Sequence, residues 1–292
     1  MKTTFYIVFF SIIFTGCHFS KSVKKDLVSG LTSVGNILSC DDVYLSVNKE
    51  KTSRKTFIYG EIFFLNFNDI KGFTSLNGKV FPGLRLIVVN QAGDTLMKYD
   101  DLYSGYKDGL DYSPLLLSTD ITLASPIRSN SEYTLFCKIW DKKGSGTFIS
   151  KFEFKVVEND QITKEGSGVT YNEIYLFSED NKKVITDNKA KVNDNIHIIV
   201  EGLTGFKEEN KLLFPGLSLK ITDAGKNSIL DYKDLFLDYS ETGVSVTDFF
   251  TRVSSHFKVS EGKINNPLEC EMVIWDKKSN ARLKVKTNII MD

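Results

Sequence analysis

Apolar and polar residues alternate along much of the chain, and this alternation predicts β-strands. The clearest case is residues 217–222, where Leu217, Leu219 and Ile221 alternate with polar residues. A period of two puts one set of side chains on each face, which indicates a strand with one buried face. Other stretches either alternate in the same way or are rich in β-branched and aromatic residues, and both features predict strands. These strands are expected at 42–49, 56–68, 84–89, 95–99, 115–123, 133–140, 147–157, 195–200, 272–275 and 282–290.

The same landmarks occur twice. Residues 81–84 (FPGL) recur as residues 214–217, an offset of 215−82 = 133. Three further pairs of segments match, and all four pairs occur in the same order in both copies. They are 43–45 with 174–176, 99–102 with 232–235, and 139–143 with 274–278. A repeat of about 130 residues is long enough to bury its own core, so an internal duplication into two domains is predicted.

The repeated segment 81–84 contains residues that are typical of a turn. Pro82 fixes φ and Gly83 tolerates positive φ, which predicts a type II turn with Phe81 anchored in the core. A hairpin turn is predicted at 90–94, where Gly93 is the permissive residue.

The turn spacing and the lack of a strong helical pattern predict an all-β protein of two tandem antiparallel β-sandwich domains. The first repeat is expected at 39–158 and the second at 168–292, separated by a polar linker at 159–167 that permits some hinge movement. The aromatic segment 246–259 of the second repeat has no counterpart in the first, so the copies have diverged there.

The amino terminus predicts an export signal. A short basic start precedes a nearly uninterrupted apolar run over 5–14, which is too short for a stable membrane span. Residues 1–16 are interpreted as a signal peptide and 17–38 as a tether. Val23, Leu27 and Leu31 follow helical steps, whereas the glycines of this stretch favour a disordered stalk, and both possibilities stay open.

Phe14-Thr15-Gly16-Cys17 resembles the lipobox of bacterial lipoproteins, which implies lipidation at Cys17 and removal of the preceding peptide. A signal anchor, or an ordinary signal peptide with an incidental cysteine, is the alternative. His18 is not the inner-membrane retention Asp of that family, and no acidic run follows. The resemblance therefore implies the outer membrane, with the periplasmic side favoured over the cell surface.

The order of landmarks in both repeats resembles immunoglobulin-like or fibronectin-type domains of bacterial, Bacteroidota-like envelope proteins. That resemblance covers both copies and implies a non-catalytic role.

Charge and composition narrow the chemistry. Thirty-seven basic residues balance 37 acidic ones, so there is no surplus for binding nucleic acid. The three histidines, His18, His197 and His256, do not sit in a nucleophile motif, and no glycine-rich phosphate loop or zinc-type Cys/His spacing is present. No enzyme, cofactor or metal is predicted.

Acidic residues gather after the repeated landmark. They could bind calcium through oxygen-rich loops, or be solvated loop acids, which their spacing favours. They are Asp100, Asp101 and Asp108 in the first copy, and Asp231, Asp234, Asp238 and Glu241 in the second.

Aromatic residues are the candidates for a ligand or partner surface. Trp140 and Trp275 occupy equivalent positions and could form a glycan-stacking platform or pack at the edge of their own cores. Tyr99 and Tyr232 are included in the same candidate surface.

The remaining cysteines follow Cys17. Cys40 and Cys137 could form a disulfide in an exported protein, or stay as buried free thiols together with Cys270. The sequence as a whole predicts a membrane-anchored protein that binds or scaffolds other envelope components, with glycan binding as the alternative.

Overall fold

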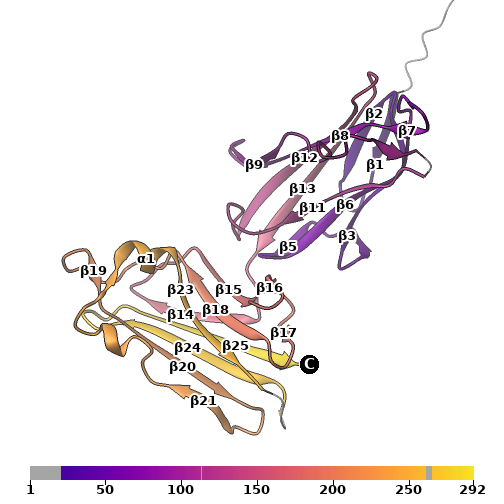
Figure 1. Cartoon of the computed structure of the whole chain (residues 1–292). Helices are drawn as coiled ribbons and strands as arrows, with labels where there is room; N and C mark the ends of the chain where they lie inside the picture. Colours follow the sequence, from indigo (N-terminus) through magenta and orange to yellow (C-terminus); the bar gives the residue numbers. More distant parts are fainter. Residues whose placement is uncertain (1–20, 113, 261–264) are drawn as a thin grey trace, which may run out of the picture.

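The computed structural model describes residues 21–112, 114–260 and 265–292, and shows two β-sandwiches that follow one another along the chain (Figure 1). Domain 1 spans residues 21–157 and domain 2 spans residues 162–292. Each has its own cluster of buried apolar side chains. The predicted all-β fold with tandem sandwiches is confirmed.

Domain 1 contains a larger sheet of order β1-β2-β13-β12-β8-β9, with β5 parallel to β13, and a smaller sheet of order β11-β6-β3-β4. A short pair, β7 and β10, closes one end. The strands are β1 (Lys21–Lys25), β2 (Thr32–Asn36), β3 (Ser39–Val47), β4 (Glu50–Thr52), β5 (Thr56–Ile58), β6 (Ile62–Lys71), β7 (Lys79–Val80), β8 (Pro82–Asn90), β9 (Thr95–Tyr99), β10 (Leu110–Asp111), β11 (Leu117–Thr122), β12 (Ser131–Asp141) and β13 (Thr147–Val157).

Domain 2 repeats this arrangement. Its sheets have the orders β14-β25-β24-β20-β21, with β17 parallel to β25, and β16-β15-β18-β23, and β19 pairs β22. The strands are β14 (Ile162–Ser167), β15 (Glu173–Ser178), β16 (Lys183–Ile185), β17 (Lys189–Ala190), β18 (Asn195–Glu201), β19 (Leu212–Leu213), β20 (Pro215–Thr222), β21 (Ser228–Tyr232), β22 (Val244–Ser245), β23 (Val253–Lys258), β24 (Leu268–Asp276) and β25 (Arg282–Met291).

The strand order is immunoglobulin-like. In domain 1, β3, β6 and β11 face β9, β8, β12 and β13, as strands A, B and E face C′, C, F and G in such sandwiches. Strand β2 adds to the free edge of β13, and β14 does the same to β25.

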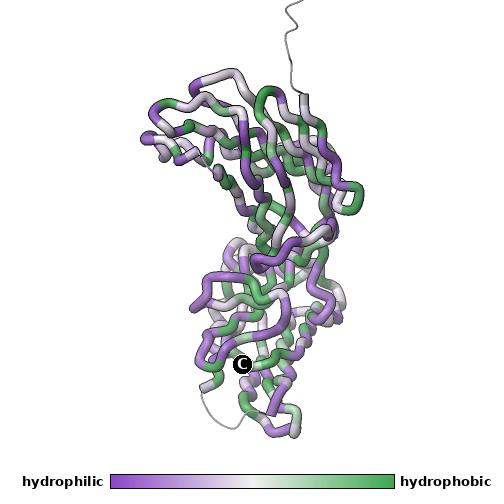
Figure 2. The backbone as a smooth tube through the Cα atoms, turned by 90° about the vertical axis from the view of Figure 1, so that its right-hand side faces the viewer, coloured by the Kyte–Doolittle hydropathy of each residue, from purple (hydrophilic) through white to green (hydrophobic). Residues whose placement is uncertain are grey.

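Alternating burial builds the core, and the alternation of green and purple along the strands is visible in Figure 2. In β13 every second side chain is buried. Its Phe152 and Phe154 make edge-to-face contacts with Phe57 and Phe63, at ring-centroid distances of 5.5–6.3 Å. Such contacts add to the stabilisation that burial provides.

The predicted tether differs from the structure. Residues 21–36, expected outside the domain, form the hairpin of β1 and β2, and β2 pairs with β13. Leu31 and Leu38 are 3% and 0% exposed within the core of domain 1. A strand forms here because the edge of β13 offers unpaired backbone groups and because Leu31 has a core to enter.

The predicted linker is also shorter in the structure. Residues 162–167 form β14 inside the sheet of domain 2, which leaves four residues, 158–161, between the domains. Asn159 is 4% exposed and donates from Nδ2 to Oδ1 of Asn188 at 2.8 Å. The expected hinge is therefore a short connection held by hydrogen bonds.

The divergent aromatic segment of domain 2 contains the helix α1 (Val246–Thr251), followed by β23. The side chain of Ser245 caps the helix by accepting from the backbone N–H of Asp248, as N-cap serines do. Phe249 points into the core, whereas Phe250 is exposed. A 3-10 helix, η1 (Leu237–Tyr239), lies before it, and neither helix in the described part of the chain is long and apolar enough to span a bilayer.

Candidate functional site

The repeated landmarks meet in space. Trp140 of β12 lies directly opposite Gly83 of β8, and Trp275 of β24 lies opposite Gly216 of β20. A Cβ atom added to either glycine would stand 2.1 Å from indole Cε2 of its tryptophan. The glycine is therefore needed for this close approach. The predicted type II turn at Pro82-Gly83 is wrong, because both residues begin strand β8, a position that tolerates proline.

The aspartates after the landmark hold their own loops. Asp101 Oδ1 accepts from the backbone N–H groups of Leu84 and Tyr103, at 3.2 and 2.9 Å, and its Oδ2 lies 2.7 Å from Nζ of Lys142. Burial opposes ionisation of Asp101, but these bonds outweigh it and lower its pKa. In domain 2, Asp234 and Lys277 form the same pair at 2.8 Å.

The aspartate after each tryptophan is equally structural. Asp141 accepts from the backbone N–H groups of Thr74 and Lys143, at 2.7 and 2.9 Å. Asp276 accepts from Lys207 and Lys278 at the same two distances. The duplicated motif thus fastens two loops at one end of each sandwich, and this explains its recurrence.

The candidate aromatic surface is divided between two sides of each sheet. Trp140 and Trp275 are partly exposed on the outward face, where they cover their glycines. Tyr99 lies opposite Leu86 and Tyr232 lies opposite Leu219, both of which point into the core. The tyrosines are 45% and 49% exposed because β9 and β21 are edge strands. Trp and Tyr therefore do not form one surface.

The cysteines of the described residues are free thiols. Cys40 lies in the smaller sheet and Cys137 in the larger one, and both are buried, as is Cys270. Desolvation raises the pKa of Cys40 to about 11 and that of Cys270 to about 12, so both stay protonated. The proposed Cys40–Cys137 disulfide is not formed. Cys17 lies outside the described residues.

Two of the histidines lie side by side on the outward face of the smaller sheet of domain 2. The rings of His197 and His256 are 5.3 Å apart, and Nε2 of His197 lies 3.2 Å from Oε2 of Glu179. Within residues 21–112, 114–260 and 265–292 no group of three or more His, Cys, Asp or Glu side chains is placed to hold a metal ion.

The outward face of the larger sheet of domain 1 is the candidate interaction surface. It carries Val34, Ile149 and Phe136, which are 39%, 44% and 37% exposed. Val34 lies opposite Ile149, and Phe136 lies opposite the half-buried Ile87. We call these four residues the domain 1 face. Alternation predicts that they point outward, but it does not show that they adjoin one another, because that depends on register.

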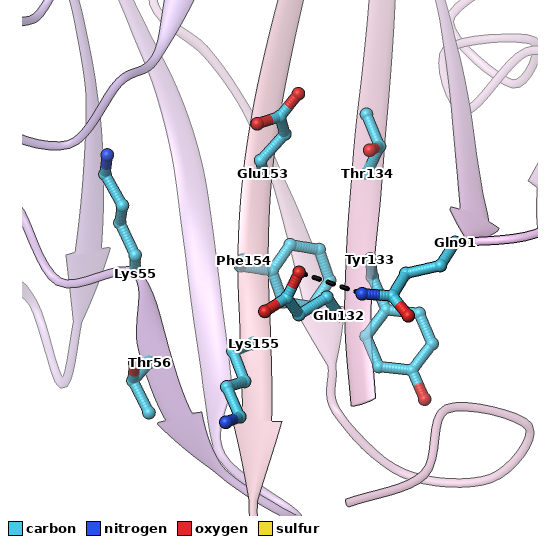
Figure 3. A pocket seen from close by; sticks show the side chains of 9 residues that line it. All are labelled: Lys55, Thr56, Gln91, Glu132, Tyr133, Thr134, Glu153, Phe154 and Lys155. Carbon is cyan, nitrogen blue, oxygen red and sulfur yellow. Dashed lines mark hydrogen bonds between the residues drawn. The ribbon is translucent and has the colours of Figure 1, made fainter. Parts of the chain in front are cut away.

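A hollow of about 360 Å³ opens beside the domain 1 face (Figure 3). Thr134 and Glu153, on β12 and β13, line it two residues beyond Phe136 and Lys151. Gln91 donates from Nε2 to Oε2 of Glu132 at 2.9 Å across one side. Lys55 and Lys155 complete the polar rim. The hollow thus continues the apolar surface and has a polar rim with charges of both signs.

The two domains also contact each other directly. Glu173 of domain 2 is 1% exposed, and its Oε1 accepts from the backbone N–H of Ser129 in domain 1 at 2.7 Å. Arg128 of domain 1 donates to Oε2 of Glu201 at 2.9 Å. The hydroxyl of Tyr175 donates to Oε1 of the same carboxylate at 2.7 Å.

Apolar contacts complete this junction. Tyr175 packs against the core of domain 1, with its ring 5.3 Å from that of Tyr59. These contacts bury part of the outward face of the smaller sheet of domain 2.

No protein-family model matches this chain, and no curated protein matches it in sequence. Solved structures similar to it include the fibronectin(III)-like modules of CbhA from Clostridium thermocellum, at 10% identity and a TM-score of 0.20, covering 85% of this chain and 94% of that one. The C-terminal domain of the antigen I/II-family protein AspA from Streptococcus pyogenes is similar at 13% identity and a TM-score of 0.27, covering 87% and 100%.

A DUF3823 family protein from Bacteroides ovatus is similar at 10% identity and a TM-score of 0.21, covering 76% of this chain and 93% of that one. None of these similarities carries an argument about what the chain binds. Its own strand order and paired motifs define the class: a protein of two tandem immunoglobulin-like β-sandwiches.

Proposed function

We propose that this protein is lipid-anchored through Cys17 in a bacterial outer membrane, on the periplasmic side, and that it binds or scaffolds other envelope components without catalysing a reaction. The observation that carries the proposal is the junction around Glu173 and Tyr175, which contact Ser129 and Tyr59 of domain 1. Two sandwiches fixed to each other present their sheet faces and loops in one arrangement. Preorganisation of this kind favours binding, because less conformational freedom is lost when a partner docks.

Chemical cross-linking of the tagged full-length chain in intact envelopes tests this proposal. We expect discrete complexes of higher mass, and we expect their amount to fall when Cys17→Ser releases the chain from the membrane. Recovery of the monomer alone, or complexes that are unaffected by Cys17→Ser, would contradict the binding role or the anchor, respectively.

Glycan binding is the second candidate, and the partial exposure of both tryptophans on outward sheet faces favours it. Each indole covers a glycine with one face, which leaves the other side for a sugar ring. Acrylamide quenching of Trp fluorescence, with and without envelope polysaccharide, tests this idea. Protection by the polysaccharide supports a glycan platform, whereas unchanged quenching argues against it.

A further inference from the structure

The duplication provides an internal comparison for the domain 1 face. Strands β2, β13, β12 and β8 of domain 1 correspond to β14, β25, β24 and β20 of domain 2. The opposed pair Val34–Ile149 becomes Glu165–Lys284 in domain 2, and the pair Phe136–Ile87 becomes Glu271–Lys220. All four apolar residues of the domain 1 face therefore have charged counterparts.

Two of these counterparts, Lys284 and Glu271, form an ion pair on the outward face of domain 2. Nζ of Lys284 lies 3.2 Å from Oε2 of Glu271, and Nζ of Lys286 lies 2.9 Å from the same oxygen. The same sheet thus forms with charged residues at these positions, so the fold does not require apolar ones. A cluster of adjoining exposed apolar side chains that folding does not need is typical of an interaction site.

At one position the charged residue lies in domain 1 and the apolar residue in domain 2. Lys138, at the centre of the domain 1 face, corresponds to Val273 in domain 2. Val273 is 5% exposed, so it adds little apolar surface to domain 2. Lys138 is exposed and has no ion-pair partner among the described residues.

Charge around the domain 1 face indicates the kind of partner. Six exposed cations and three exposed anions share this side of the sheet, a surplus of 6 − 3 = 3 positive charges. The cations are Lys25, Arg85, Lys98, Lys138, Lys151 and Lys155, and the anions are Asp100, Glu132 and Glu153. Two copies of this chain joined through the same face would oppose like charges, which disfavours self-association.

We propose that the domain 1 face docks an acidic amphipathic segment of another envelope protein. Its apolar side chains cover Val34, Phe136 and Ile149, and its carboxylates lie near Lys138 and the surrounding lysines. This inference rests on the proposed binding function and names the surface and the chemistry of the partner.

A photo-reactive amino acid in place of Ile149 tests the inference in the full-length, anchored chain within intact envelopes. The matched control carries it in place of Lys284, the equivalent position of domain 2. We expect an adduct from position 149 only, and we expect mass spectrometry to place the cross-link in a protein segment that combines acidic and apolar residues.

A second pair of variants separates loss of docking from loss of folding. Phe136→Glu with Ile87→Lys introduces the residues that domain 2 carries at the same positions. We expect the adduct from position 149 to fall at least tenfold, while the thermal unfolding of domain 1 changes little. Lys138→Glu, which keeps the apolar residues, should lower the adduct several-fold.

Other results overturn the inference in distinguishable ways. An adduct from position 284 but not from 149 keeps the binding function and rejects this surface. An adduct from 149 to lipid, to a second copy of this chain, or to a basic segment rejects the proposed partner chemistry. The absence of adducts at both positions, together with monomer alone in the chemical cross-linking, rejects both proposals.

Discussion

Each tryptophan of this protein covers a glycine of the neighbouring strand, and this pair is the residue-scale basis of the duplicated motif. The indole replaces the packing that the missing glycine side chain cannot supply, as aromatic residues do when they lie across a strand glycine. The aspartate that follows the tryptophan then fixes a second loop. The glycine motif and the tryptophan motif are far apart in the sequence, but they recur together because they form the two sides of one contact.

Gly83→Ala should destabilise domain 1 by about 1–3 kcal/mol, because the new methyl group would overlap the Trp140 indole and force it from its site. Urea unfolding, followed by the fluorescence of Trp140, measures the loss. Gly105→Ala is the matched control, since an added Cβ there meets nothing within 4 Å. An equal effect at both glycines would contradict the account.

Asp101→Asn should cost about 1–2 kcal/mol near pH 7, because it removes a charge-assisted contact to Lys142 at 2.7 Å. The pKa of Asp101 is lowered in the folded state, with its burial outweighed by hydrogen bonds. Its contribution is therefore present above the unfolded pKa of about 3.9 and is lost as pH falls through the folded pKa. The difference in unfolding free energy between Asp101→Asn and the native chain should therefore vanish at low pH. A pH-independent difference, measured by urea unfolding, would exclude the ionic contribution.

At the scale of elements, β2 and β14 are the same strand in the two copies. Each extends the larger sheet by pairing with the last strand of its domain, β13 or β25. Both precede the first strand of the smaller sheet. In domain 1 the edge strand β1 lies outside β2, whereas in domain 2 β14 is itself the edge strand. Residues 21–36 are thus part of the folded unit.

A chain that begins at Ser39 should lose much of the stability of domain 1 relative to one that begins at Lys21. Its loss includes the buried side chains of Leu31 and Leu38, which contribute about 3–6 kcal/mol together. Differential scanning calorimetry of both chains measures the loss, and the transition of domain 2 serves as the internal control. Identical transitions for domain 1 would show that residues 21–38 are a tether after all.

Strand positions could be predicted because alternation is a local property of the chain. The strands around Leu219 and Phe152 illustrate this, since both combine β-branched or aromatic residues with a period of two. The Trp140–Gly83 contact could not be predicted, because it depends on the register between strands 57 residues apart, 140 − 83. The β1–β2 hairpin could not be predicted, because Val23, Leu27 and Leu31 also fit helical steps, and only the free edge of β13 decides between the two structures.

At the scale of the whole molecule, the junction joins two similar domains into one unit, in which the equivalent faces of the two domains differ in what they contact. Domain 2 contributes Glu173, Tyr175 and Glu201 to the contact, and domain 1 leaves apolar residues exposed on its larger sheet. The two copies therefore present different outward faces: that of domain 1 carries exposed apolar residues, and that of domain 2 carries ion pairs.

Glu173 should make the stability of this junction depend on pH. Desolvation raises its pKa in the folded chain. Its contribution is therefore fully present below the unfolded pKa of about 4.3 and is lost as pH rises through the folded pKa. Glu173→Gln keeps an acceptor for the Ser129 N–H and removes the titration. Between pH 4 and 7 the native chain should lose more stability than the variant, as measured by urea unfolding, and parallel pH profiles would contradict this role.

The distance between the domains tests the central claim most directly. Spin labels on Thr95→Cys and Ser228→Cys, both at exposed edge positions, report it by pulsed electron resonance on the chain from Lys21 onward, whose native cysteines are buried. Gly60→Ala is the comparison, because an added Cβ would stand 2.3 Å from Cβ of Val184 across the junction. We predict one narrow distance distribution for the native chain and a broader one for Gly60→Ala. A native distribution as broad as that of the variant would contradict a fixed two-domain platform.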